Sequence, residues 1–173
     1  MQTKTINIQY FNTPVGELIL GSYEGKLCLA DWQYRKKREQ IDNRLQKALG
    51  AEYVEEDTEV LQKARKQLTE YFNHKRKIFD IPLLLVGTDF QKSVWQGLIE
   101  TPFGTTSSYL ELAKQIGNEK AVRAVATANG ANTISIIIPC HRIIGSNGEL
   151  VGYAGGLDVK RKLLELENNL FNL

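Results

Sequence analysis

The chain has 173 residues, of which 22 are basic and 20 acidic, so its net charge is +2, and 42% of its residues are hydrophobic. This composition is typical of a soluble globular protein, and no run of about 18 apolar residues could span a membrane. The near-neutral charge does not by itself indicate a nucleic-acid binder, so such a function has to rest on local motifs. The N-terminus alternates polar and apolar residues and lacks a signal-peptide core, which predicts a cytoplasmic protein.

Four side chains have the chemistry of soft metal ligands: Cys28, His74, Cys140 and His141. Two cysteines are too few for a disulfide framework, so we expect two free thiols. A zinc site that uses all four side chains is conceivable, but structural zinc ligands usually come in closely spaced pairs. We therefore expect no metal.

The first half of the chain predicts a small antiparallel sheet followed by helices. Residues 5–31 contain three short β-rich runs separated by turn residues. Helical spacing then predicts one helix in 33–50, with an apolar side of Ile41, Leu45, Ala48 and Leu49, and a second in 58–75. The basic cluster at residues 35–38 is predicted to be a solvated helix start rather than a DNA-binding patch.

The composition changes near residue 87, where glycines become more frequent, so we predict two domains, 1–86 and 87–173. Thr88 and Gln91 have the spacing of a capping box, which opens a helix that stops before Pro102. Ser108 and Glu111 repeat this pattern and open a short helix that ends near Gly117.

A second short helix, capped by Asn118 and ended by Gly130, completes the pattern of a helix-turn-helix. We expect its small side chains to point inward: Ala121, Val122, Ala124, Val125 and Ala128. Small residues allow close approach to a DNA groove, but they also pack helices together, so both interpretations remain open. Asn147-Gly148 predicts a tight hairpin, which after a helix-turn-helix would be a wing.

The stretch "IPCHRII" at residues 138–144 places Cys140 directly before His141, at the end of the most apolar segment. A buried cysteine is usually structural, but a nearby base or positive charge turns a thiol into a nucleophile. On an extended strand adjacent side chains point opposite ways, so His141 would reach Cys140 through a water. A carboxylate to hold the imidazole could come from Glu149, Glu165 or Glu167. A final helix is expected from Asp158, with an apolar face of Leu163, Leu166 and Leu170.

The run "PCHRII", with "SYLELA", "RAV" and "GAN" before it and "GYAGGL" after it, resembles the O6-alkylguanine-DNA alkyltransferases, in particular the single-chain bacterial type. The resemblance covers at least residues 88–167, and "TPVGELIL" extends it into the first domain. It implies an α+β fold, with an N-terminal ribonuclease H-like domain and a C-terminal winged helix-turn-helix DNA-binding domain. It also implies direct DNA repair: the alkyl group of O6-alkylguanine, and of O4-methylthymine, moves once and irreversibly to a cysteine of the protein, without a cofactor.

Matching positions imply a catalytic role for five residues. Cys140 accepts the alkyl group, His141 takes its proton through a water, and Glu167 orients His141. Tyr109 helps to flip the nucleotide and protonates the guanine, while Asn132 links the recognition helix to the active-site loop.

The same resemblance implies that a monomer binds the minor groove of double-stranded DNA containing O6-alkylguanine, and no membrane. Arg123 would fill the space of the extruded base, and Ala121 and Ala124 would let the helix backbone approach the DNA. The implied base pocket contains Ile143, Tyr153 and Ala154, where the main-chain carbonyls of Cys140 and Ile143 contact guanine and the main chain of Ala154 contacts O6.

Two positions depart from the family pattern. Thr133 follows the asparagine where the family usually has proline, and Ala154 stands where some members have serine. Three other functions stay open: a non-catalytic lesion-binding protein, disfavoured by the intact Cys140, a thiol hydrolase with a Cys-His pair, and a plain winged-helix regulator.

Overall fold

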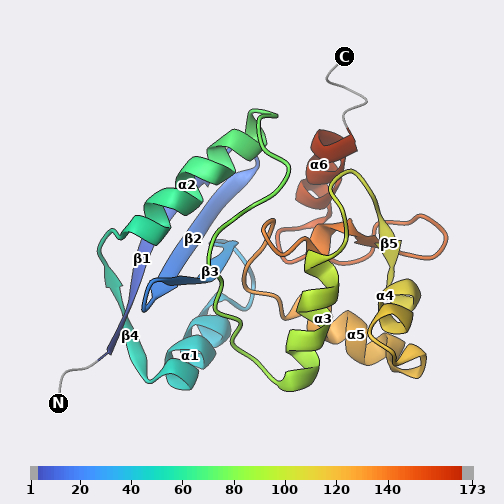
Figure 1. Ribbon diagram of the computed structural model, residues 1–173, viewed down its shortest axis with the longest axis horizontal. Helices are drawn as coiled ribbons and strands as arrows, with labels where there is room; N and C mark the ends of the chain where they lie inside the picture. The colour runs from blue at the N-terminus through green and yellow to red at the C-terminus, as the bar shows by residue number, and fades with distance from the viewer. Residues whose placement is uncertain (1–3, 169–173) are drawn as a thin grey trace. The chain divides into compact units, whose positions relative to one another are not determined.

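The computed structural model describes residues 4–168. The chain divides into two compact units, Met1–Val86 and Gly87–Leu173 (Figure 1). Among the described residues, no helix is long and apolar enough to cross a membrane.

The first unit is built on a four-stranded sheet in the order β3-β2-β1-β4. Strands β1 (Lys4–Thr13), β2 (Gly16–Tyr23) and β3 (Lys26–Trp32) pair antiparallel as predicted. Strand β4 (Ala51–Glu55) was not predicted, and it lies parallel to β1, so the sheet is mixed rather than purely antiparallel. Only Ala51 of β4 is buried, so the strand has no alternating apolar pattern by which its sequence could have revealed it.

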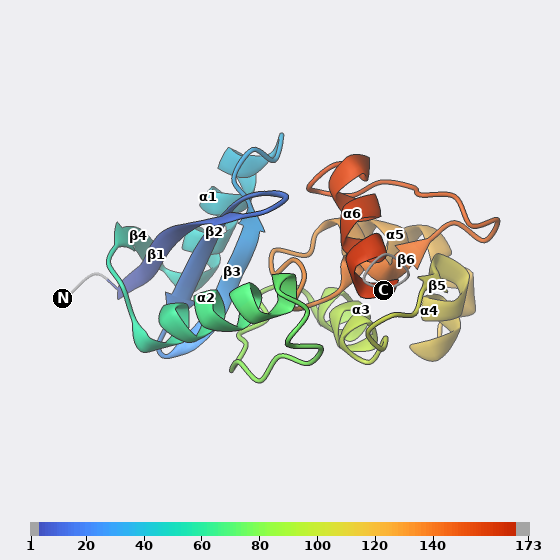
Figure 2. The same cartoon turned by 90° about the horizontal axis from the view of Figure 1, so that it is seen from above.

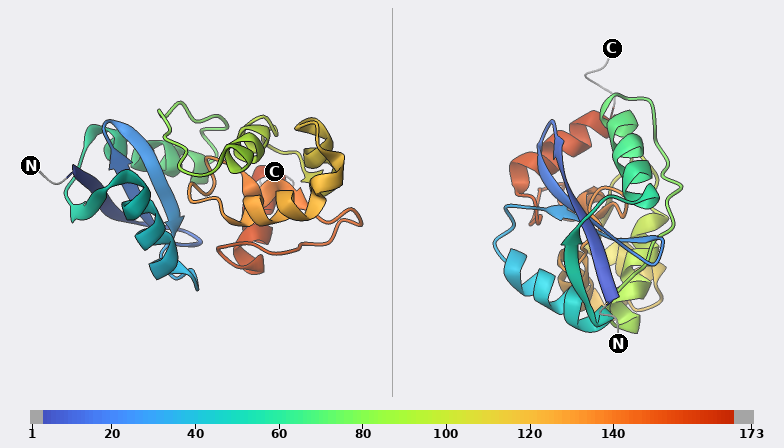
Figure 3. Two further views of the ribbon diagram at one scale, coloured as in Figure 1. Left: turned by 90° about the horizontal axis from the view of Figure 1, so that it is seen from below. Right: turned by 90° about the vertical axis from the view of Figure 1, so that its left-hand side faces the viewer.

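Two helices cover opposite faces of this sheet (Figures 2 and 3). Helix α1 (Arg38–Leu49) buries Ile41 and Leu45 and ends at Gly50 in the left-handed conformation, but Ala48, expected on its apolar side, is exposed. Helix α2 (Glu59–Phe72) begins at Thr58, whose hydroxyl accepts the Leu61 N–H. Five apolar residues have helical spacing in this segment, and the helix buries Leu61, Ala64, Leu68 and Tyr71, whereas Phe72 is half-buried.

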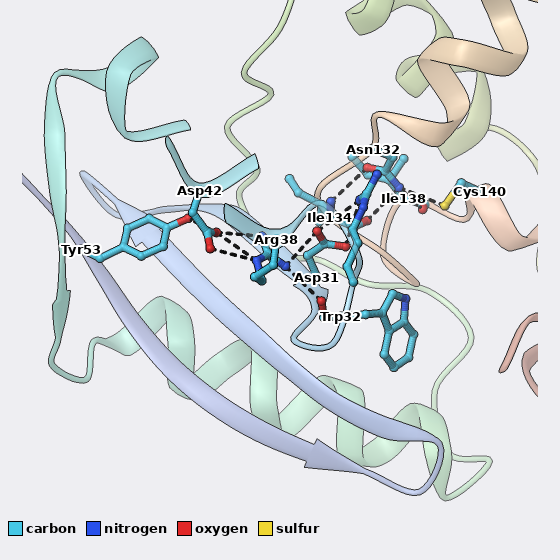
Figure 4. A network of polar contacts seen from close by, with 10 residues as sticks. Asp31, Trp32, Arg38, Asp42, Tyr53, Asn132, Ile134, Ile138 and Cys140 are labelled. Carbon is cyan, nitrogen blue, oxygen red and sulfur yellow. Dashed lines mark hydrogen bonds and ion pairs between the residues drawn. The ribbon is translucent and has the colours of Figure 1, made fainter. Parts of the chain in front are cut away.

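The basic cluster before α1 is only partly solvated, which corrects the sequence interpretation. Lys36 and Lys37 are exposed. Arg35, however, reaches the fully buried carboxylate of Asp31 with an N–O distance of 3.2 Å. Arg38 reaches the same carboxylate at 3.0 Å (Figure 4). These two arginines therefore hold the end of β3 against the start of α1.

Over residues 87–168, the second unit contains four α-helices, two single 3-10 turns and a two-stranded parallel sheet. They are α3 (Asp89–Ile99), α4 (Tyr109–Gln115), α5 (Val122–Gly130), α6 (Leu157–Asn168), η1 (Glu119–Ala121), η2 (Cys140–Arg142), β5 (Ser107–Ser108) and β6 (Ile143–Ile144). The predicted capping box of Thr88 and Gln91 opens α3. Trp95 of α3 donates its indole N–H to the carbonyl of Ala128 in α5 at 2.9 Å, so α5 is fixed to the core near its C-terminal end.

Helices α4 and α5 form the helix-turn-helix, with two differences from the predicted one. Ser108 accepts the Glu111 N–H at 3.1 Å, but the Glu111 carboxylate accepts from Ser107 instead of completing a capping box. The second helix begins at Val122 after η1, without a side-chain cap from Asn118. Of its small residues Val125 and Ala128 are buried, whereas Ala121 and Val122 are half-buried and Ala124 is exposed.

The predicted wing is not a hairpin of two strands. The Asn147-Gly148 turn is present, with the Gly148 N–H bonded to the Gly145 carbonyl at 2.9 Å. Strand β6, however, pairs with β5 in parallel, and the described residues after the turn form no returning strand. In α6, Leu163 is buried and Leu166 half-buried, while Leu170 lies outside the described residues.

Candidate active site

The apolar segment that leads to Cys140 folds into consecutive turns rather than the expected strand. The Ile138 N–H bonds to the Ile134 carbonyl at 3.0 Å, and Ile136 lies in the left-handed region at φ 70°. The carboxamide of Asn132 takes the place of a strand partner: Oδ1 accepts the Ile134 N–H and Nδ2 donates to the Ile138 carbonyl, both at 3.0 Å (Figure 4). Asn132 thus joins the end of α5 to the segment that carries the thiol.

Cys140 opens η2 and is 3% exposed. Asn132 Nδ2 lies 3.3 Å from its Sγ, in position to donate a hydrogen bond to the sulfur. Beside the thiol is a pocket of about 180 Å³, lined by Tyr109, Ala126, Asn129, Gly130, Cys140, Gly152, Tyr153 and Ala154. The implied pocket residues Tyr153 and Ala154 are therefore in place around the predicted nucleophile.

The other cysteine has a different environment. Cys28 lies in β3, where its Sγ is 3.6 Å from the Gly21 carbonyl and burial raises the pKa of its thiol to about 12. A thiol with so high a pKa is almost wholly protonated at neutral pH and is a poor nucleophile. Within residues 4–168, no three metal-binding side chains of the His, Cys, Asp and Glu types come together.

Of the three carboxylates left open by the sequence, Glu167 of α6 contacts His141. The Glu167 Oε2 atom lies 2.6 Å from His141 Nε2. The same carboxylate accepts two hydrogen bonds from Arg142, from Nε at 2.7 Å and from Nη2 at 3.0 Å. Arg142 also donates to the Thr101 carbonyl at 2.7 Å, which ties the whole group to the end of α3.

The charges of this group follow from its burial. Burial alone would raise the pKa of Glu167, but His141 and Arg142 outweigh it and lower the value to about 2, so Glu167 is ionised at neutral pH. Burial lowers the pKa of His141, and nearby Arg142 and Lys160 add to this against the opposing effect of Glu167. A neutral imidazole that donates Nε2–H to Glu167 has its lone pair on Nδ1, and this buried atom has no hydrogen-bond partner among the described residues.

Tyr109 contacts the loop that follows Cys140, and Ile143 begins this loop. The Tyr109 hydroxyl donates to the Val151 carbonyl at 3.1 Å, and burial together with the charge of Cys140 raises the pKa of Tyr109. The Ile143 N–H donates to the Cys140 carbonyl, and the Ile143 carbonyl accepts from Lys160 Nζ at 2.5 Å. Both carbonyls implied to contact guanine therefore already have one protein donor.

Of the four residues assigned to DNA contact, Tyr109 lines the pocket, whereas the other three do not. Arg123 and Ala124 are exposed on α5, and Ala121 is half-buried in η1. The C-terminal part of α5 borders the pocket through Ala126 and Asn129. Helix α5 thus carries both exposed residues that could meet DNA and residues that line the pocket.

The sequence interpretation missed two supporting residues, Lys160 and Thr101. Lys160 is fully buried, and Thr101 accepts Arg142 through its main chain, which no side-chain motif can reveal. For Lys160 a signal was present: it stands seven residues before Glu167 and three before the apolar Leu163, so all three share one helix face.

The second unit thus combines a helix-turn-helix with a buried thiol beside a histidine and a carboxylate. Two family models match the chain: the 6-O-methylguanine DNA methyltransferase DNA-binding domain at residues 89–169 and the ribonuclease-like domain of the same enzymes at residues 6–85. The chain therefore belongs to the 6-O-methylguanine-DNA methyltransferase family, and the predicted family and α+β class are confirmed.

Known members of this family match the chain over nearly the whole length of both sequences. The methylated-DNA–protein-cysteine methyltransferase of Methanosarcina acetivorans is 45% identical over 92% of this chain and 96% of its own. The constitutive enzyme of Bacillus subtilis is 41% identical over 90% and 91%. The crystal structure of Mycobacterium tuberculosis OGT in complex with DNA matches with a TM-score of 0.81 at 39% identity, covering 94% of this chain and 93% of the other.

Proposed function

We propose that this chain repairs O6-methylguanine in double-stranded DNA by moving the methyl group to Cys140. The observation that carries the assignment is the position of this thiol: it borders a pocket, lies within hydrogen-bond distance of Asn132, and directly precedes a histidine held by Glu167. The deeply buried, protonated Cys28 offers no comparable site.

The chemistry follows from the charges of the site. The Cys140 proton passes through a water to His141 Nδ1, and Asn132 Nδ2 stabilises the resulting thiolate. The thiolate attacks the methyl carbon: the S–C bond forms, the C–O6 bond breaks, and its electron pair stays on the guanine. Tyr109 supplies a proton to the departing base after its hydroxyl leaves the Val151 carbonyl. The phenolate then regains a proton from solvent and the His141 imidazolium releases one to solvent, so no net charge remains in the site. Because a thioether does not revert, each molecule acts once.

The target methyl group lies inside the duplex, so the nucleotide must be extruded before it can reach the pocket. We assign this step to α5, which presents the exposed Arg123 and Ala124. Ala124, with Ala121, allows the backbone to approach the minor groove, and Arg123 fills the space that the base leaves, as intercalating side chains do in other minor-groove binders.

Three finer assignments complete the proposal. O4-methylthymine is a second substrate, because its methyl group and O4 occupy a position on the thymine ring equivalent to that of the methyl group and O6 on guanine. The protein acts as a monomer, since every residue assigned to the chemistry comes from one unit of one chain. Transfer requires a free thiol, which a reducing compartment such as the cytoplasm maintains.

Intact-protein mass measurement after incubation with methylated duplex DNA tests the proposal. We expect the mass of one methyl group per protein, mapped to Cys140, with no further turnover. Cys28→Ser should react like the wild type, and Cys140→Ser should bind DNA without gaining mass. Methyl on Cys28 would overturn the assignment, repeated turnover would favour a hydrolase, and binding without transfer would favour a lesion-binding protein or a regulator.

A further inference from the structure

Lys160 is a fully buried lysine whose ammonium is surrounded by main-chain carbonyls. Its Nζ donates to Ile143 O at 2.5 Å, Val151 O at 3.1 Å and Gly152 O at 3.2 Å. An ammonium has three donors, so this geometry uses all of them. Lysine is almost never fully buried unless it is paired, yet no carboxylate among residues 4–168 forms an ion pair with it.

The three carbonyls belong to the two ends of one loop, residues 143–152, which we call the pocket loop. Ile143 follows η2 directly and is bonded through its N–H to Cys140, whereas Gly152 lines the pocket itself. Val151, next to Gly152, also accepts the hydroxyl of Tyr109. Lys160 therefore joins the arm that carries the nucleophile to the arm that forms the pocket wall.

Helix α6 supplies this contact from the same face that holds the histidine. Lys160, Leu163 and Glu167 are buried and spaced by three and seven residues. One rigid helix therefore positions the pocket loop through Lys160 and the imidazole through Glu167.

The charge of Lys160 also bears on the thiol. Burial lowers the pKa of Lys160, while the charge of Cys140 acts in the opposite direction, so ammonium and thiolate stabilise one another. The titratable groups around the thiol are Tyr109 of α4, His141 of η2 and Lys160 of α6, with Arg142 and Glu167 paired to each other behind His141. Lys160 contributes a positive charge that has no paired carboxylate to cancel it.

We propose that Lys160 is a positioning residue of the alkyl transfer, whose buried ammonium clamps both arms of the pocket loop and places a positive charge near Cys140. This role rests on the proposed function, because it concerns the same pocket and nucleophile. It assigns to α6 a second contribution beyond holding the histidine through Glu167.

Lys160→Met and Lys160→Arg test the clamp, with Lys162→Met as the matched control on the exposed side of the same helix. The first measurement is single-turnover transfer from methylated duplex at increasing DNA concentration. For Lys160→Met we expect the limiting rate constant to fall about tenfold or more, the loss typical of a charged buried hydrogen-bonding group. The half-saturating DNA concentration should change little, because α5 is untouched.

The second measurement is the pH profile of Cys140 modification by iodoacetamide without DNA, followed by peptide mapping. Lys160→Met should shift its midpoint upward by about one pH unit through loss of the positive charge. Lys160→Arg should keep the wild-type midpoint but transfer more slowly, because a planar guanidinium cannot reproduce three converging donors. Lys162→Met should match the wild type in both.

A wild-type limiting rate in Lys160→Met would overturn the proposal. So would a slowed rate with an unshifted pH midpoint and a lowered unfolding temperature, since these mark a purely structural residue. If the wild-type protein transfers no methyl group at all, the proposed function fails instead, and the iodoacetamide profile still reports on Lys160 independently.

Discussion

The carboxylate of Glu167 contacts His141 at one oxygen and Arg142 across both. This sharing gives a reason for the adjacent thiol, imidazole and guanidinium in the proposed reaction, in which Cys140 would react, His141 would accept the proton, and Arg142 holds the carboxylate that contacts His141. Part of the carboxylate's charge is compensated by the guanidinium, so Glu167 orients the imidazole without making it permanently cationic. A neutral histidine is what a proton acceptor requires.

The lowered pKa of Glu167 predicts acid sensitivity. The group has a pKa of about 2 in the fold against 4.5 ordinarily. Its stabilisation is therefore present above pH 4.5 and lost as the pH falls towards 2, a loss of about 3 kcal/mol at most. Urea unfolding of wild type and Glu167→Gln at several pH values should show the variant less stable at pH 7, with the difference shrinking below pH 4.5. A difference independent of pH would contradict the assignment.

The sequence alone predicted the thiol and the imidazole of the site but not which carboxylate contacts the imidazole. The sequence placed Cys140 beside His141, but it left three carboxylates open, because only the packing of α6 decides which one faces the imidazole. Glu165, two residues away, points elsewhere and lies 3.7 Å from Arg161. The particular roles came from the family resemblance. The sequence shows neither which main-chain carbonyls Lys160 contacts nor that the Thr101 carbonyl accepts from Arg142.

At the scale of elements, α5 combines an exposed face with a pocket-lining end. Arg123 is exposed and forms no ion pair among residues 4–168. If its role is to occupy the space of the extruded base, Arg123→Ala should slow repair of methylated duplex about tenfold or more. It should spare transfer from the free base O6-benzylguanine, which needs no extrusion. Equal losses on both substrates, measured by single-turnover kinetics, would remove Arg123 from this role.

The junction between β3 and α1 depends on Asp31. Its buried carboxylate accepts from Arg35 and Arg38. Arg38 also pairs with Asp42 at 2.8 Å (Figure 4). Removing the charge leaves two partly buried guanidinium groups under-compensated, so Asp31→Asn should reduce the free energy of unfolding by about 3 kcal/mol.

The exposed pair of Asp57 and Arg65 provides the control for this prediction. Its N–O distance is also short, 2.8 Å, but both side chains are substantially solvated. Asp57→Asn should therefore cost at most about 1 kcal/mol. Urea denaturation measures the free energy of unfolding of both variants. Equal losses of this free energy would show that burial does not make the Asp31 ion pairs more stabilising than the exposed pair.

Elements with their own local signals were predicted, and those that depend on distant partners were not. Helices α2 and α3 begin at hydroxyl caps and carry an apolar face, both visible in sequence. Strand β4 exists because β1 offers it an edge. The segment before Cys140 turns because one carboxamide, that of Asn132, supplies hydrogen bonds to it. At the predicted wing the Gly145 N–H bonds to the Glu149 carbonyl across the turn, but no returning strand follows among the described residues.

At the scale of the whole molecule, the candidate site belongs to the second unit, from Thr101 at the end of α3 to Glu167 in α6. Net charge is +2 over the entire chain. Such a molecule has no strong overall field to attract DNA, so affinity must come from a few local contacts and from the extruded base in its pocket.

This balance predicts a weak salt dependence of DNA binding. Each phosphate neutralised contributes about −0.9 to the slope of log K against log salt concentration, and strongly basic binders neutralise about six to ten. For this chain we expect a slope shallower than about −4, measured by fluorescence anisotropy with the Cys140→Ser variant so that no transfer intervenes. Methylated and unmethylated duplexes should give parallel lines, because the pocket contacts release no counterions. A slope near −8 would instead require a concentrated basic surface that the net charge conceals.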